Sequence, residues 1–184
     1  AKAVALASIA RDVSQETGVC IAVAPQTVDL SPVIKAVKIP VFAQHIDPVG
    51  YGRFTGHILP EAIAEAGCVG TLINHSERRL PLETIEATVK RAKEAGLFQV
   101  VCVDSVETGR SVAPFSPDVI AIEPPELIGS GIPVSKAKPE VVSESVAQCR
   151  NVNPNVKVLC GAGITSGEDV KAALLLGSAG VLVA

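Results

Sequence analysis

Short apolar runs alternate with helix-like segments along the whole chain. The apolar runs, which we expect to be strands, cover residues 19–24, 40–44, 69–74, 98–103, 118–123, 156–160 and 180–184. Helical patterns cover residues 1–17, 30–37, 60–66, 83–95, 106–112, 139–150 and 167–176. Because no two apolar runs are joined by a hairpin signal, the pattern predicts parallel strands with helical crossovers. The sequence therefore predicts an α/β fold, with residues 1–184 forming a single domain.

Two architectures satisfy this alternation, an open doubly wound sheet and a closed (βα)8 barrel. A doubly wound sheet usually has a glycine-rich turn after its first strand, whereas Ala24-Pro25-Gln26 follows the first apolar run here. Polar or small residues end most of the expected strands, and in a barrel these ends converge on one site. They are Gln44, Asn74, Asp104, Glu123 and Gly161. This placement favours the barrel.

Seven strands preceded by a helix are what remains of eight βα units when the first strand and the last helix are absent. The runs 19–24 and 180–184 would then be unpaired edges, which favour aggregation. We therefore expect an incomplete barrel made of its second to eighth strands. The alternative is a complete seven-stranded sheet.

Composition excludes several classes of function. A net charge of -3 and 3% aromatic residues leave no basic surface interleaved with aromatics, so nucleic acid is not an expected partner. No apolar run is as long as a bilayer span, and no secretory signal is present, so we expect a cytoplasmic protein without a membrane partner. The cysteines lack C-x-x-C pairing and the histidines lack metal-ligand spacing. We expect buried free thiols and neither a metal nor a cofactor. The cysteines are Cys20, Cys68, Cys102, Cys149 and Cys160.

A carboxylate ends the apolar run 118–123. Glu123 is followed at once by Pro124 and Pro125, which cannot continue a central strand. Farther on, Gly129 and Gly131 allow positive φ and a close approach of the backbone to a ligand. The pattern predicts a lid beside an acid or base. An ordinary surface loop with an exposed glutamate is the alternative.

A histidine follows the run 69–74. His75 directly precedes Ser76, a residue that often caps helices. If a helical turn begins there, the positive end of its dipole disfavours a charged imidazole. A neutral His75 could donate a hydrogen bond to a substrate oxygen. The alternative is a histidine that only belongs to the turn, and the pairing with Glu123 two strands along favours the functional interpretation.

Small residues follow the run 156–160. Gly161-Ala162-Gly163 leads into a helix start at Thr165, and exposed N–H groups beside a helix N-terminus suit a phosphate. Ala184 ends the next strand, at the place where a barrel commonly completes a phosphate site. In addition, the glycine-rich loop 47–59 contains Thr55 near its tip and is either a surface loop or a subunit contact.

Three motifs at these strand ends resemble one known family. Residues 74–78 (Asn-His-Ser-Glu-Arg), 123–131 and 160–163 are similar to triosephosphate isomerase. Pro-Pro-Glu-Leu in the lid, Ala-Gln-His-Ile-Asp at 43–47 and Pro-Val-Ser-Lys from Pro133 resemble its archaeal branch. The resemblance implies a (βα)8 TIM barrel, no cofactor, and an enzyme of glycolysis and gluconeogenesis. Its reaction interconverts dihydroxyacetone phosphate and D-glyceraldehyde 3-phosphate through an enediolate.

The resemblance also implies roles for individual residues. Glu123 corresponds to the catalytic base and His75 to the electrophile. Thr55 corresponds to a residue that enters the neighbouring subunit of a homodimer or homotetramer. The substrate-binding positions are Ile128, Gly129, Gly163 and Ala184; the lid positions are Pro124, Pro125, Glu126, Leu127, Ser130 and Gly131; the supporting positions are Asn74, Ser76 and Glu77.

One family feature has no counterpart. The family carries an Asn-x-Lys motif at the tip of its first strand, which would precede Ala1, and neither Lys2, Lys136 nor Lys138 replaces that lysine on sequence grounds. We therefore expect little isomerase activity from these 184 residues alone. The alternatives are another phosphate-binding barrel enzyme, such as an aldolase, and a non-catalytic sugar-phosphate-binding barrel. An aldolase would need a Schiff-base lysine or a metal at a strand tip.

Overall fold

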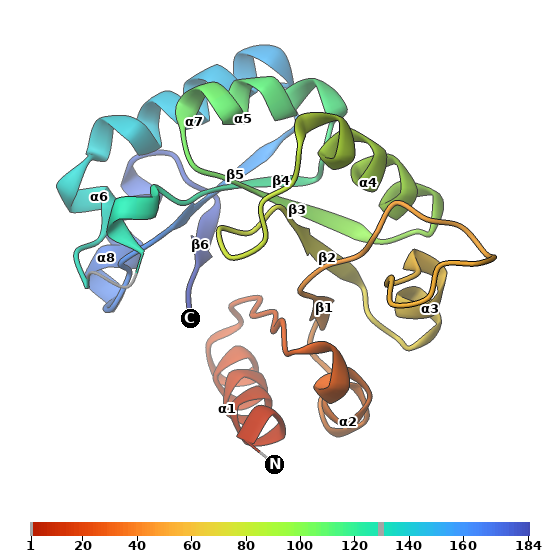
Figure 1. The fold of residues 1–184 in the computed structure, drawn as a ribbon. Helices are drawn as coiled ribbons and strands as arrows, with labels where there is room; N and C mark the ends of the chain where they lie inside the picture. Colours follow the sequence, from red (N-terminus) through yellow and green to blue (C-terminus); the bar gives the residue numbers. More distant parts are fainter. Residues whose placement is uncertain (1, 129–130) are drawn as a thin grey trace. The chain divides into compact units, whose positions relative to one another are not determined.

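All paired strands in the computed structural model are parallel, and their hydrogen-bonded order equals their order in the chain (Figure 1). The structure describes residues 2–128 and 131–184. The contacts divide the chain into two compact units, residues 1–73 with 87–99, and residues 74–86 with 100–184. The α/β class with parallel strands is therefore confirmed. The strands are β1 (Phe42–Ala43), β2 (Gly70–Ile73), β3 (Phe98–Val103), β4 (Val119–Ile122), β5 (Lys157–Gly161) and β6 (Gly180–Leu182).

The first unit holds β1, β2 and the start of β3. Its helices are α1 (Lys2–Thr17), α2 (Leu30–Ala36), α3 (Pro60–Glu65) and most of α4 (Leu82–Glu94), with a 3-10 turn at Thr27–Asp29. An edge-to-face pair of aromatic rings, Phe42 and Phe98, stands with centroids 5.9 Å apart. A Cβ on Gly70 would lie 2.3 Å from the Phe42 ring, so the ring pair leaves room only for glycine there.

The apolar run 19–24 does not form the expected buried strand. Within the described chain, only Val23 forms a bridge, to Val41, and Val19 is 57% exposed. An apolar run becomes a buried strand only if neighbouring elements cover it. Here the backbone of Val23 is hydrogen-bonded to Pro40 and Phe42. Cys20 in this run is exposed, which corrects the expectation of five buried thiols; the other four cysteines are buried and free.

The second unit holds the rest of β3 together with β4, β5 and β6. Its helices are α5 (Val106–Val112), α6 (Val134–Ala137), α7 (Pro139–Val152) and α8 (Gly167–Leu175), with 3-10 turns at Ala113–Phe115 and Pro125–Leu127. Helices α5 and α7 pack side by side over β4 and β5 (Figure 1). The short helix α6 was not predicted, so the simple alternation of one helix per strand fails there. The seven predicted helices all occur, with ends within two residues of the expected ones.

The strand register brings the carboxyl ends of β3 to β6 to one edge. Val103 pairs with Ile122, Ile122 with Cys160, and Gly161 with Leu182. Residues that follow these strands therefore gather at the same edge, which is where candidate site residues were predicted. In the described part of the chain, no helix is long and apolar enough to cross a membrane.

Candidate active site

Glu123 stands directly beyond β4, with its backbone tied to β3. Its N–H donates to the carbonyl of Val103 at 2.8 Å, and the residue is only 5% exposed. A Cβ on Gly161 would lie 2.6 Å from Cγ of Glu123. The carboxylate side chain thus packs against the bare backbone of β5, in a space that only glycine leaves open.

The Glu123 carboxylate is buried and incompletely paired. Among the described residues, its Oε2 atom has no hydrogen-bond partner. Its Oε1 atom lies 3.7 Å from Nε2 of His75. A buried carboxylate oxygen without a partner is costly, and such groups are typical of catalytic sites. The arrangement suits a base whose missing partner is supplied by a substrate.

A cysteine thiol lies beside this carboxylate. Burial, and then the negative charge of Glu123 together with a hydrogen bond to it, raise the pKa of the Cys102 thiol well above its usual value. The thiol therefore stays protonated at neutral pH and donates to the carboxylate. Sequence reasoning had treated Cys102 only as a buried thiol, because nothing local shows which neighbouring strand faces it.

The loop that carries His75 is held by Asn74. Asn74 has φ 61°, a left-handed conformation that asparagine tolerates better than most residues. Its side-chain amide donates to the carbonyl of Cys102 at 2.8 Å, and its oxygen accepts from the N–H of Leu80 at 2.7 Å. One buried side chain thus connects the start of the loop, its end and β3.

A turn, and not a longer helix, follows His75. Ser76 and Glu77 form a turn, in which the N–H of Arg78 donates to the carbonyl of His75 at 2.8 Å. A single turn has no helix dipole, so the electrostatic argument for a neutral imidazole does not apply. The cap signal of Ser76 is local, and it does not specify how far a helix continues.

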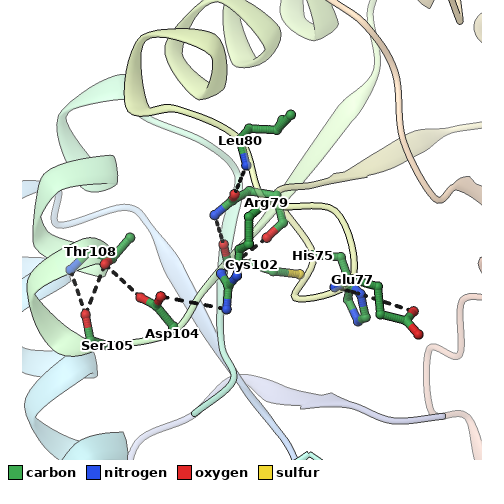
Figure 2. A network of polar contacts seen from close by, with 9 residues as sticks. His75, Glu77, Arg79, Leu80, Cys102, Asp104, Ser105 and Thr108 are labelled. Carbon is green, nitrogen blue, oxygen red and sulfur yellow. Dashed lines mark hydrogen bonds and ion pairs between the residues drawn. The ribbon is translucent and has the colours of Figure 1, made fainter. Parts of the chain in front are cut away.

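A different contact specifies the tautomer of His75. The N–H of Glu77 donates to Nδ1 of His75 at 3.3 Å, so Nδ1 acts as an acceptor and a neutral ring carries its proton on Nε2. The Glu77 carboxylate also lies 3.6 Å from Nδ1, a contact that Figure 2 draws as a dashed line. It attracts only a protonated ring, and water weakens this attraction because the Glu77 side chain is 89% exposed. The proton on Nε2 then faces the Glu123 side of the site.

Arg79 and Asp104 brace the same loop (Figure 2). Arg79 Nη1 donates to the carbonyl of Asn74 at 3.4 Å, and its Nη2 lies 3.9 Å from Asp104 Oδ2. Burial raises the pKa of Asp104, but the hydrogen bond from Thr108 and the charge of Arg79 outweigh it and hold the pKa below its usual value. Sequence reasoning missed this pair, although an aspartate at a strand tip was a usable signal.

The loop after β5 has an unusual backbone. Ala162 and Gly163 have φ 74° and 71°, and an alanine in this region is strained. A Cβ on Gly163 would lie 2.0 Å from the carbonyl oxygen of Ile132, so this position requires glycine. Ser166 caps α8 in a capping box with Asp169. The register of Gly161 with Leu182 puts exposed Ala184 near the same loop.

The lid positions are only partly described. Pro125–Leu127 is a 3-10 turn in which Leu127 is buried, and Ile128 follows with 41% of its surface exposed. Gly131 has φ 71°, in agreement with its predicted conformational role. Gly129 and Ser130 lie outside the described residues.

The loop 47–59, in the other unit, is closed at its base. Two hydrogen bonds join Asp47 and Ile58. The N–H of Asp47 donates to the carbonyl of Ile58 at 2.9 Å, and the N–H of Ile58 donates to the Asp47 carboxylate at 2.7 Å. Arg91 donates two bonds of 3.1 Å to the carbonyl of Val49. Thr55 is exposed on this loop beside Phe54, which is 44% exposed.

The parallel strands, with buried Glu123 and half-buried His75 beyond their carboxyl ends, place this chain among α/β enzymes with a site at that edge. A family model described as triosephosphate isomerase matches residues 1–184. The chain belongs to the triosephosphate isomerase family.

Curated relatives support this assignment. A triosephosphate isomerase of Methanosarcina acetivorans is 60% identical over 182 residues, 99% of this chain and 82% of the relative. The triosephosphate isomerase of Methanocaldococcus jannaschii is 58% identical over 179 residues, which are 97% of this chain and 82% of the relative. That of Methanothermobacter thermautotrophicus is 56% identical over 183 residues, 100% and 80%. These sources are methanogens, which confirms the archaeal-type resemblance.

Proposed function

We propose that this chain interconverts dihydroxyacetone phosphate and D-glyceraldehyde 3-phosphate through an enediolate. The observation that carries the proposal is the buried, partly unpaired Glu123 carboxylate with Nε2 of His75 at 3.7 Å. The names of the curated relatives agree with this reaction. We also propose that the parallel strands belong to a (βα)8 barrel of the family type.

The two side chains divide the proton transfer between them. Glu123 takes a proton from the carbon next to the carbonyl and becomes a carboxylic acid, while the substrate becomes an enediolate. The Nε2–H of His75 donates a hydrogen bond to the oxygen that gains charge. His75 passes its Nε2 proton to that oxygen and takes the proton of the adjacent hydroxyl group, so that the carbonyl moves to the other carbon. Glu123 then returns its proton to the carbon that held the original carbonyl, and both side chains end as they began. These are the roles known for the family.

Three segments surround this pair in the proposal. The phosphate is held by Ile128, Gly129, Gly163 and Ala184, and residues 124–131 close over it. The left-handed backbone of Ala162 and Gly163 beside the start of α8 supports a phosphate there, because such turns expose N–H groups. Lys136 and Lys138, the lysines near the lid, are engaged in ion pairs with Asp169 and Glu126, so neither is proposed to contact the substrate.

Isotope exchange tests the reaction. These 184 residues alone are expected to have little activity, so the test uses a long incubation with dihydroxyacetone phosphate in deuterium oxide. We expect the glyceraldehyde 3-phosphate that forms to carry solvent deuterium at C-2, because the base exchanges its proton with the solvent. The isotope content of the product is measured by proton NMR. Conversion without any deuterium at C-2 would indicate a hydride shift and exclude the enediolate. No conversion would refute the proposed activity of this chain.

We propose that the chain assembles with copies of itself, as a homodimer or homotetramer, through the loop 47–59. The closed base of the loop and its exposed Phe54 support this, since a rigid loop with an exposed aromatic tip suits a protein contact.

Replacing Phe54 with aspartate is expected to shift the assembly toward monomers, because a charge would be buried in the contact. Molar mass by light scattering after size-exclusion chromatography measures the effect. Val28→Asp is the control, since Val28 is 78% exposed outside the loop. An unchanged molar mass in Phe54→Asp, or the same dissociation in Val28→Asp, contradicts the assignment.

A further inference from the structure

The segment that follows Gly131 lies directly on the loop after β5. The carbonyl oxygen of Ile132 would be 2.0 Å from a Cβ on Gly163, and the N–H of Val134 donates to the carbonyl of Ala162 at 3.3 Å. Val134 is fully buried in a cluster that includes Leu127, Val142, Cys160 and Ala173. Backbone contact and apolar packing thus join residues 132–134 to the loop proposed to hold the phosphate.

Asp169 organises the far end of the same loop. It is 2% exposed, and its Oδ2 atom accepts hydrogen bonds from the Thr165 N–H at 3.2 Å, the Thr165 hydroxyl at 3.1 Å and the Ser166 N–H at 3.0 Å. In a capping box, the side chain of the third helical residue needs to accept only one hydrogen bond, from the N–H of the N-cap residue. Three bonds to a single oxygen therefore hold the loop more firmly than capping alone requires.

The second oxygen of Asp169 binds a lysine from the segment after the lid. Lys136 Nζ lies 2.5 Å from Asp169 Oδ1, and the hydroxyl of Ser135 donates to the backbone carbonyl of Asp169 at 3.4 Å. Lys136, and then the bonds from Ser166 and Thr165, lower the pKa of Asp169 well below its usual value. The Asp169 carboxylate is therefore ionised at neutral pH.

The position of Lys136 is what makes this pair informative. Lys136 belongs to α6, the short helix between the lid and α7, and its side chain is 57% exposed. An exposed lysine adds little to folding stability. It does, however, connect the segment that ends the lid to a buried carboxylate that already holds the phosphate loop.

We propose that Lys136 and Asp169 are positioning residues, whose ion pair holds residues 132–136 in a fixed register on loop 161–166 and so sets the affinity of the site for phosphate. The inference rests on the proposed function, since it assumes that this loop holds the substrate phosphate. Neither side chain touches the substrate. The pair acts by keeping the end of the lid and the phosphate loop aligned.

Lys136→Met tests this inference, with Lys171→Met as the matched control on the exposed face of α8. In Lys136→Met we expect KM for dihydroxyacetone phosphate and the Kd for inorganic phosphate each to rise about 3- to 10-fold, the size of one charge-assisted contact. We expect kcat to change less than about twofold, because the chemical groups are untouched. Lys136→Arg is expected to restore both constants, and Lys171→Met to leave them unchanged.

Two further measurements separate positioning from stability. Thermal unfolding of each variant shows whether Lys136→Met acts only through the fold; a lower Tm with unchanged KM and Kd overturns the inference. In a double-mutant cycle with Asp169→Asn, we expect the two effects on the phosphate Kd to be non-additive, because they break one contact. Additive effects overturn it as well.

The outcomes also distinguish this inference from the proposed function. A wild-type chain that isomerises triose phosphates and binds inorganic phosphate, with Lys136→Met equal to it, overturns the inference alone. A wild-type chain that does neither overturns both.

Discussion

Glu123→Gln is expected to lower kcat about 10²- to 10⁴-fold in both directions of the isomerisation, with KM changed less than about threefold. The amide keeps the shape of the carboxylate but cannot accept the carbon-bound proton, so the loss falls on the transition state. The Oε2 atom of Glu123 is buried without a hydrogen-bond partner among the described residues, which costs stability. Replacing the charged carboxylate with a neutral amide is therefore not expected to destabilise the fold. Steady-state kinetics and a thermal melt of the same preparation measure both expectations.

Glu144→Gln is the matched control for this prediction. Glu144 is an exposed glutamate on α7, outside the lid and the site. The same substitution there removes no contact with the substrate, so we expect kcat to change less than about threefold. If Glu123→Gln retains activity within about tenfold of the wild type, another residue is the base.

Gly161→Ala is expected to lower kcat about 100-fold, because the added methyl group would lie 2.6 Å from Cγ and 3.1 Å from Oε1 of Glu123. Relief of that clash displaces the carboxylate, and a displacement of about 1 Å in a reacting group can cost 10²-fold in rate. The φ angle of Gly161 is not positive, so its backbone conformation is open to alanine. We expect crowding by the added methyl group to lower the free energy of unfolding by about 1–3 kcal/mol. Kinetics with a urea unfolding curve separate the two effects.

Gly167→Ala controls for the loss of a glycine near the site. Gly167 begins α8, and a Cβ at this position would have no atom of the described residues within 4 Å. We expect its activity and stability to equal those of the wild type or slightly exceed them. Full activity in Gly161→Ala would show that the Glu123 carboxylate has room to move and that its contact with β5 does not position it.

Local signals predicted the helices well and the strands less well. Helix α5 begins and ends at the predicted residues, because a cap at Ser105 and an apolar face are both local. The run 19–24 looks like a buried strand, yet its side chains are exposed or half-buried, because burial depends on neighbours that a short run cannot specify. Helix α6 spans four residues, too few to show a helical period.

The candidate site divides in the same way. The position of Glu123 could be predicted, since a carboxylate between a β-branched run and two prolines must stand at a strand end. The turn at Ser76 could not, because the capping signal is equally compatible with a short turn. The contacts of Asn74, Cys102 and Asp104 join residues from different strands and have no signature in the sequence.

The sequence by itself determined the α/β class and the family, and it predicted Glu123 and His75 as the reacting side chains. Hydrophobic periodicity, strand-ending residues and short motifs are properties of contiguous residues. Only the tertiary structure decided that Glu123 lies against the bare backbone of Gly161, that a backbone N–H at Glu77 leaves the proton of His75 on Nε2, and that Lys136 meets Asp169. The physical reason is the same in each case. These contacts depend on strand register and loop packing, in which atoms far apart along the chain come within a few ångströms of one another.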